Sequence, residues 1–218
     1  MVTIKGMIDN MVLYNYVSLV ALLAALYYYI RYRRTFPLII PFLFVNNFME
    51  IFLVYYFGVV HKNNLLVFNY LCVIIILHYF YIYYNKFKEK SWSKYIVLTG
   101  VLWSIYTTYL VISYDPFSHF YNSYVIGLII TLVLIFLFLR DVINGKEFLD
   151  LKRYPLFYFS MGIVFFTVSS FPMLIFSEPL FIFSNSNMIN ILIQLSNIFL
   201  NIGYLGTVIY AGRNNKTL

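Results

Sequence analysis

The stretch FPLIIPFLFVNNFMEIFLVYYFG, residues Phe36–Gly58, decides how the rest of the chain is interpreted. It is apolar and close to the length of about 20 residues that crosses the hydrocarbon of a bilayer. Asn46, Asn47 and Glu50 nevertheless lie near its middle. A carboxylate at that depth is costly unless other groups partner it, so an intramembrane Glu is a candidate functional residue. The other segments are therefore read for the partners they offer to Glu50.

Composition places the whole chain in a membrane. Of its 218 residues, 62% are hydrophobic and only 11% are charged, whereas soluble domains carry about a quarter charged residues. We expect a single domain, 1–218, in contact with the lipid bilayer and without a soluble catalytic module. The net charge of +7 does not indicate nucleic-acid binding, because Lys and Arg fall in short clusters between apolar runs.

Apolar segments recur along the chain, each near the length of a membrane span. Helices are the expected form, because a membrane segment must satisfy its backbone hydrogen bonds internally and nothing alternates like a barrel strand. The sequence therefore predicts an all-α polytopic membrane protein with seven transmembrane helices. Their expected ranges are about 11–30, 37–58, 65–84, 95–114, 123–139, 154–176 and 188–211.

The distribution of positive charge predicts the topology. Thirteen of the fifteen Lys and Arg residues fall at one set of helix ends, and only Lys5 and Lys62 fall at the other. Positively charged loops face the cytoplasm. The N-terminus is therefore predicted outside and the C-terminus in the cytoplasm.

A faint internal similarity suggests a repeat. The second segment opens with a basic–aromatic–Pro-Leu pattern over Arg33–Leu38, and the sixth opens similarly over Lys152–Leu156. Helices one to three and five to seven could then be parallel triplets joined by the fourth, a 3+1+3 plan. The alternative is coincidence, since Pro suits the first helical turn anywhere.

Polar residues cluster in four of the predicted helices. Asn46 and Asn47 share a helix face with Glu50, while Gln194, Asn197 and Asn201 form a stripe on the seventh segment. Counting about 1.5 Å per residue from the inner ends puts these groups at similar depths, slightly beyond the midplane. We predict an interior polar or ligand-binding cluster in the outer half of the membrane. Its members are Asn46, Asn47, Glu50, Asn69, Ser169, Ser170, Gln194, Asn197 and Asn201.

Glu50 has two readings that the sequence leaves open. No Lys or Arg lies at its depth, which favours a protonated acid held by Asn and Ser side chains over a salt bridge. The group is either a hydrogen-bonded node that joins helices or part of a functional site. His78 falls nearer the inner end, as a satisfied interior histidine or as a proton relay.

Catalytic and metal-binding patterns are not apparent. There is no His-Glu-x-x-His sequence, and Ser169-Ser170 lacks a Gly-x-Ser-x-Gly setting. We predict no metal site, no cofactor and, on balance, no enzyme. Pro172 is expected to kink the sixth helix, because proline removes one backbone hydrogen bond.

These features together resemble a known group of proteins. A Glu in the second helix, an Asn-rich entry to the third, a Pro-aromatic start to the sixth and an Asn-rich seventh are similar to small seven-helix inner-membrane proteins of Bacteroidota. The resemblance implies a bacterial cytoplasmic membrane and interior positions for Glu50, Asn197 and Asn201. Some of those proteins are encoded near sensor kinases, which implies signalling by association. Retinal proteins share the topology, but the seventh segment has no Lys for a Schiff base.

Three functions follow as hypotheses. The first is a ligand-sensing or signalling bundle that binds a small or lipidic molecule and contacts a cytoplasmic or membrane protein partner. The second is a small-solute transporter of parallel triplets, architecturally similar to the SWEET and PQ-loop transporters although no Pro-Gln pair occurs. The third is a structural subunit of a larger membrane complex.

Overall fold

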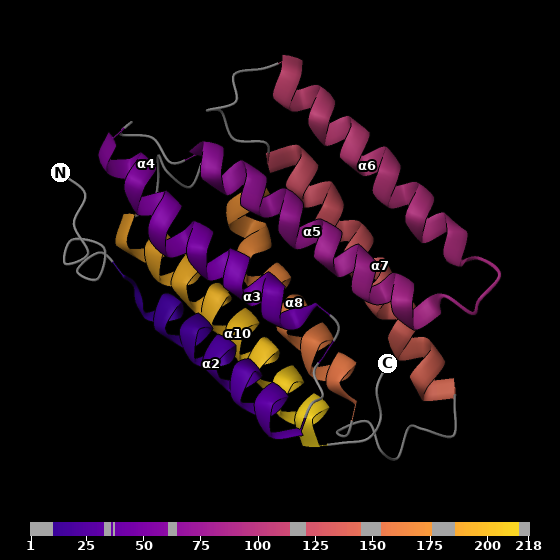
Figure 1. The fold of residues 1–218 in the computed structure, drawn as a ribbon. Helices are drawn as coiled ribbons and strands as arrows, with labels where there is room; N and C mark the ends of the chain where they lie inside the picture. Colours follow the sequence, from indigo (N-terminus) through magenta and orange to yellow (C-terminus); the bar gives the residue numbers. More distant parts are fainter. Residues whose placement is uncertain are drawn as a thin grey trace. The chain divides into compact units, whose positions relative to one another are not determined.

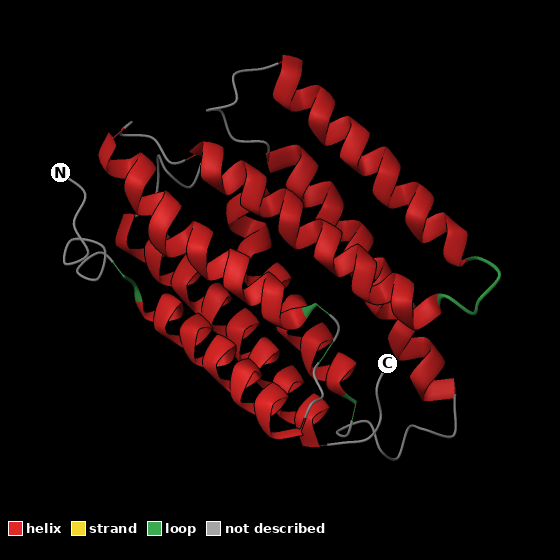
Figure 2. Ribbon diagram, in the orientation of Figure 1, coloured by secondary structure: helices red, strands yellow, loops and turns green. Residues whose placement is uncertain are grey.

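The computed structural model describes residues 11–32, 36, 38–60, 65–113, 121–144, 154–175 and 186–213. Throughout these ranges every regular element is helical and no strand occurs (Figure 2). The elements, labelled in Figure 1, are α2 (Leu13–Tyr32), α3 (Ile39–Asn47), the π-helix η1 (Phe48–Leu53), α4 (Val54–Val60), α5 (Leu65–Phe87), α6 (Ser93–Ser113), α7 (Tyr121–Asn144), α8 (Pro155–Ile175) and α10 (Ser186–Arg213).

These elements form a set of membrane-length helices. α3, η1 and α4 run on without a break as one span, Ile39–Val60. Among the described residues, six helices are long and apolar enough to cross a membrane, and α8 contributes a shorter apolar stretch, Pro155–Phe171. The prediction of an all-α membrane protein is confirmed at this level. The inside–outside orientation stays a prediction.

α5 and α7 extend furthest beyond their predicted C-terminal ends. α5 runs to Phe87 and α7 runs to Asn144, three and five residues past the apolar runs. Packing explains both extensions. The buried Phe87 ring lies 4.7 Å from that of Trp92 in the following turn, and Val142 is buried near the end of α7. A prediction from hydropathy ends a helix at its first charged residues, whereas packing of the residues beyond them allows the helix to continue.

The contacts divide the chain into two compact units, which we describe separately. The first contains residues 45–138, and the second contains residues 11–44 and 139–218. The span Ile39–Val60, which is the second membrane helix, and α7 each pass from one unit to the other. This grouping, in which the first helix joins the sixth and seventh, lends no support to parallel triplets of consecutive helices.

The second unit is built around α10, which packs against both α8 and α2. Most of the buried residues of α2 are small: Ser18, Ala21 and Ala25 are fully buried, beside the larger Asn15. Small side chains let helix backbones approach closely in a membrane. Aromatic rings fill the rest: Tyr158 stacks on Tyr210 with centroids 4.4 Å apart.

The first unit packs α5 against α6 and against the helix that carries η1. Trp103 of α6 contacts both neighbouring helices. The indole N–H donates to the Ser123 carbonyl of α7 at 2.9 Å, and the ring meets Phe80 of α5 edge-on with centroids 6.0 Å apart. Gly127 of α7 leaves room for this ring, because a Cβ there would lie 3.1 Å from it. Trp103 thus joins three helices.

Candidate functional site

The intramembrane carboxylate lies on a π-helical turn. Glu50 is the third residue of η1, and at the end of this turn the Val54 N–H donates to the Met49 carbonyl, five residues back. π-turns are rare inside α-helices and occur frequently at functional sites. The turn shifts the register of the second helix by one residue relative to a continuous α-helix. Residues before and after Glu50 therefore do not share the helix faces that α-helical spacing predicts for them.

Side chains of α5 and α7 lie close enough to the Glu50 carboxyl to interact with it electrostatically. It interacts electrostatically with the Cys72 thiol and with the Tyr124 phenol. Tyr124 interacts in turn with Cys72 and with Tyr79. We call Glu50, Cys72, Tyr79 and Tyr124 the Glu50 cluster. It brings a carboxyl, a thiol and two phenols together from three membrane helices within the first unit.

The α5 members of this cluster follow one helix face. Asn69, Cys72, Ile76, Tyr79 and Tyr83 are spaced three, four, three and four residues apart, which keeps them on one side of a helix. Ile76, Tyr79 and Tyr83 are fully buried. This periodicity was the signal that could have placed Cys72 and Tyr79 beside Glu50 from sequence, whereas polarity alone selected only Asn69.

Four of the predicted cluster residues belong to the first unit. Asn46 and Asn47 lie one turn before Glu50 and are each 5% exposed. Asn69, partly exposed, lies one turn before Cys72. The second helix thus places two buried amides and a carboxyl within two successive turns. Three potential hydrogen-bonding groups lie there inside an otherwise apolar span.

The other predicted cluster residues belong to the second unit, and their hydrogen bonds run mostly along their own helices. Ser170 donates to the Phe166 carbonyl at 2.7 Å, and Ser169 donates to the Phe165 carbonyl. The Asn197 and Asn201 amides donate to carbonyls four residues back, both at 2.9 Å. A hydroxyl that donates in this way needs no acceptor on a neighbouring helix, whereas an Asn side chain still has a second N–H and its amide oxygen to pair. The predicted convergence of Ser169, Ser170, Gln194, Asn197 and Asn201 on Glu50 joins two separately described units and stays a prediction.

Burial along α10 separates the members of its polar stripe. Asn201 is 3% exposed, whereas Gln194 and Asn197 are half-buried. Across the part of the chain that the structure describes, no donor lies within hydrogen-bond distance of Asn201 Oδ1. The buried amide oxygen of Asn201 can therefore accept a hydrogen bond from a further group.

The remaining predicted features lie around these groups. His78 is buried on α5 with its ring 6.5 Å from that of Tyr79, and its role as a relay stays a prediction. Pro172 lies in the last turn of α8, which continues to Ile175. Among the described residues, no group of three His, Cys, Asp or Glu side chains could hold a metal ion.

Comparison with known proteins does not assign the chain to a family or a function. No protein-family model matches the chain, and neither a curated protein nor a solved structure matches it. The resemblance to seven-helix proteins of Bacteroidota stays a prediction. The functional argument therefore depends on the chemistry of the Glu50 cluster.

Proposed function

We propose that this integral membrane protein is a non-enzymatic sensor that binds a small or lipidic molecule at the Glu50 cluster. The observation that carries the proposal is the carboxyl on a π-turn inside a membrane helix, with a thiol and a phenol as electrostatic neighbours. An intramembrane carboxyl is costly, and such groups usually mark ligand or ion sites. The proposed orientation has the N-terminus outside the bacterial cytoplasmic membrane.

The chemistry of the cluster favours binding over catalysis. Reactive cysteines sit beside cationic groups or helix N-termini, whereas Cys72 lies inside α5 beside a carboxyl. The nearest His along the same helix, His78, is six residues away, about 9 Å along the axis. A carboxyl and a phenol in apolar surroundings instead suit a ligand with a hydroxyl or carbonyl group on a hydrophobic body.

The π-turn also favours a sensing role, because ligand binding could change its hydrogen-bond register. A turn with one extra residue can change its hydrogen-bond register while the flanking helices α3 and α4 stay intact. Occupation of the cluster would then bias the register of η1. The second helix would transmit that change towards its cytoplasmic end, where a protein partner could respond.

Ligand-dependent stability provides a direct test. Purified protein in mild detergent is mixed with members of a panel of fatty alcohols, fatty acids and short-chain quinones, and the Tm of each mixture is measured. We expect at least one class to raise the Tm of the wild type, and this effect to be lost in Glu50→Gln.

Asp141→Asn is the matched control, since the Asp141 carboxylate lies near the end of α7 and pairs with Arg140 rather than with the cluster. It should respond to the panel as the wild type does. Equal responses of Glu50→Gln and the wild type to every class would refute the proposal. Flux of the same compounds into proteoliposomes tests the transporter hypothesis, and saturable flux lost in Glu50→Gln would replace sensing by transport.

A further inference from the structure

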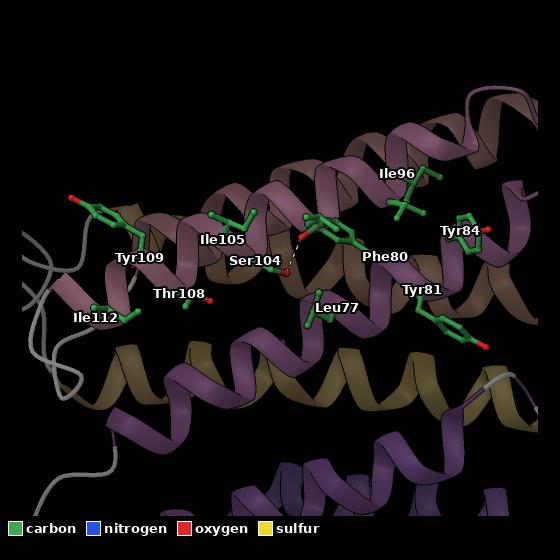
Figure 3. A pocket seen from close by; sticks show the side chains of 13 residues that line it. Leu77, Phe80, Tyr81, Tyr84, Ile96, Ser104, Ile105, Thr108, Tyr109 and Ile112 are labelled. Atoms are coloured by element: carbon green, nitrogen blue, oxygen red, sulfur yellow. Dashed lines mark hydrogen bonds between the residues drawn. The ribbon is translucent and has the colours of Figure 1, made fainter.

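The α5–α6 hairpin of the first unit contains a long open groove, separate from the Glu50 cluster. Its volume is about 680 Å³. Leu77, Phe80, Tyr81 and Tyr84 line it from α5, and residues between Ile96 and Ile112 line it from α6. Figure 3 shows these side chains along the two helices, with Tyr84 and Ile96 at one end and Tyr109 and Ile112 at the other.

The groove is lined almost entirely by hydrocarbon. Ser104 faces it, but its hydroxyl donates to the Gly100 carbonyl of its own helix at 2.8 Å, the dashed line in Figure 3. Gly100 forms part of the wall, because a Cβ there would approach the Phe80 ring to 3.1 Å. The chemistry of the lining therefore suits an alkyl chain.

The groove is long enough to hold an acyl chain from one leaflet. Ile96 and Ile112 are separated by about 24 Å along the helix axis. One leaflet is half of a hydrocarbon core about 30 Å thick, or about 15 Å deep. An acyl chain that enters at the Tyr84 end can therefore lie wholly within the groove and occupy roughly two thirds of its length.

Positive charge gathers at the same end of the groove. Lys88, Lys90 and Lys94 are exposed around the turn that joins α5 to α6, with Glu89 as the one acidic residue among them. The turn is held in shape by its backbone, since the Lys90 N–H donates to the Phe87 carbonyl at 2.8 Å. The Ser93 hydroxyl adds a bond to the Lys88 carbonyl at 3.3 Å. Three lysines at the mouth of an apolar groove complement a phosphate joined to an acyl chain.

We infer that the α5–α6 hairpin binds an anionic phospholipid, with one acyl chain in the groove and the headgroup phosphate on Lys88, Lys90 and Lys94. A second copy of the chain is a less suitable occupant. In a symmetric pair the positively charged α5–α6 turns of the two copies would meet and repel each other. The lipid would fix α6, which packs chiefly on α5, at the edge of the first unit.

The test uses full-length protein, delipidated in mild detergent and titrated with dioleoyl phosphatidylglycerol or dioleoyl phosphatidylcholine. Native mass spectrometry counts the bound lipids. We expect one lipid to bind with a preference for phosphatidylglycerol. The double variant Lys90→Gln with Lys94→Gln should weaken phosphatidylglycerol binding on the order of tenfold. The charge-matched control Arg31→Gln with Arg140→Gln, at exposed sites on α2 and α7, should retain the preference.

A second pair of variants tests the groove itself. Val101 lines it, whereas its neighbour Leu102 is similarly exposed but does not. Val101→Trp should weaken binding of both lipids, and Leu102→Trp should not, with circular dichroism verifying that both variants are folded. Equal lipid binding by Val101→Trp and Leu102→Trp, or no preference for phosphatidylglycerol in the wild type, overturns the inference. A lipid-independent dimer that Val101→Trp abolishes would assign the groove to a second copy instead.

Discussion

Gly162 of α8 and Gly203 of α10 meet backbone to backbone. A Cβ added to Gly162 would lie 2.9 Å from the Gly203 Cα, and one added to Gly203 would lie 2.6 Å from the Gly162 Cα. Both distances are too short for a real side chain. The contact between these two helices therefore requires glycine on both sides, as in small-residue interfaces of other membrane helices.

We predict that Gly162→Ala lowers the free energy of unfolding by about 1–3 kcal/mol, because the new methyl group must push α8 away from α10. Denaturation of the purified protein in mixed micelles, followed by circular dichroism, measures this loss. Gly58→Ala is the control, since nothing lies within 4 Å of the added Cβ on α4. It should be neutral or stabilising by about 0.5–1 kcal/mol, because alanine is the better helix former. Equal stability of the two variants would mean that α8 and α10 do not touch at Gly162.

Trp103→Phe should lower the free energy of unfolding by about 1–2 kcal/mol, because the indole bond to the Ser123 carbonyl is lost and part of a buried ring is removed. Trp103 is 4% exposed and joins α5, α6 and α7. Heat denaturation in detergent gives the comparison. Trp92→Phe is the matched control, since Trp92 is partly exposed in the turn after α5. The prediction fails if the control loses as much stability as Trp103→Phe.

The helices were largely predictable from sequence because a membrane span requires a continuous apolar run of fixed length. The ends of α5 and α7 were not, since Phe87 and Val142 are held by tertiary contacts. Nor could the π-turn at Glu50 be read from Phe48–Leu53, which contains no proline or glycine. Its register depends on what packs around it.

The candidate site was predictable only in part. Polarity selected Asn46, Asn47 and Glu50. The structure buries Asn46 and Asn47, and a shared functional site for the three residues stays a prediction. Polarity did not find Cys72, which only the periodicity of the α5 face indicates. It did not find Tyr124 either, because packing between helices brings this residue near Glu50 and leaves no local pattern in the sequence. Ser169 and Ser170 were selected by their predicted depth in the membrane. Both hydroxyls donate to backbone carbonyls of the preceding turn of α8, so a similar depth does not by itself place a hydroxyl in a shared site.

The topology can be checked with reporters. We expect a fluorescent protein fused after Leu218 to fluoresce in bacterial cells and an alkaline phosphatase fused there to be inactive, because thirteen of the fifteen Lys and Arg residues lie at the ends predicted to be cytoplasmic. Fusions within the segment Asp115–Tyr121 should give the opposite pair of results. Active phosphatase at the C-terminus would reverse the orientation of every helix and place the lysines of the α5–α6 turn outside.

A double-mutant cycle distinguishes a real Glu50–Tyr124 interaction from chance proximity. Glu50→Leu and Tyr124→Phe each remove one polar partner, and their effects on unfolding should be non-additive. Couplings between polar groups in membrane proteins average about 0.6 kcal/mol and reach about 1.7 kcal/mol, so a value in this range is expected. Tyr109→Phe replaces Tyr124→Phe in the control cycle, because Tyr109 is 62% exposed in the lipid groove. Its coupling to Glu50→Leu should be indistinguishable from zero. If both cycles give the same coupling, Tyr124 is no partner of Glu50, and the Glu50 cluster reduces to the carboxyl and its neighbours on α5.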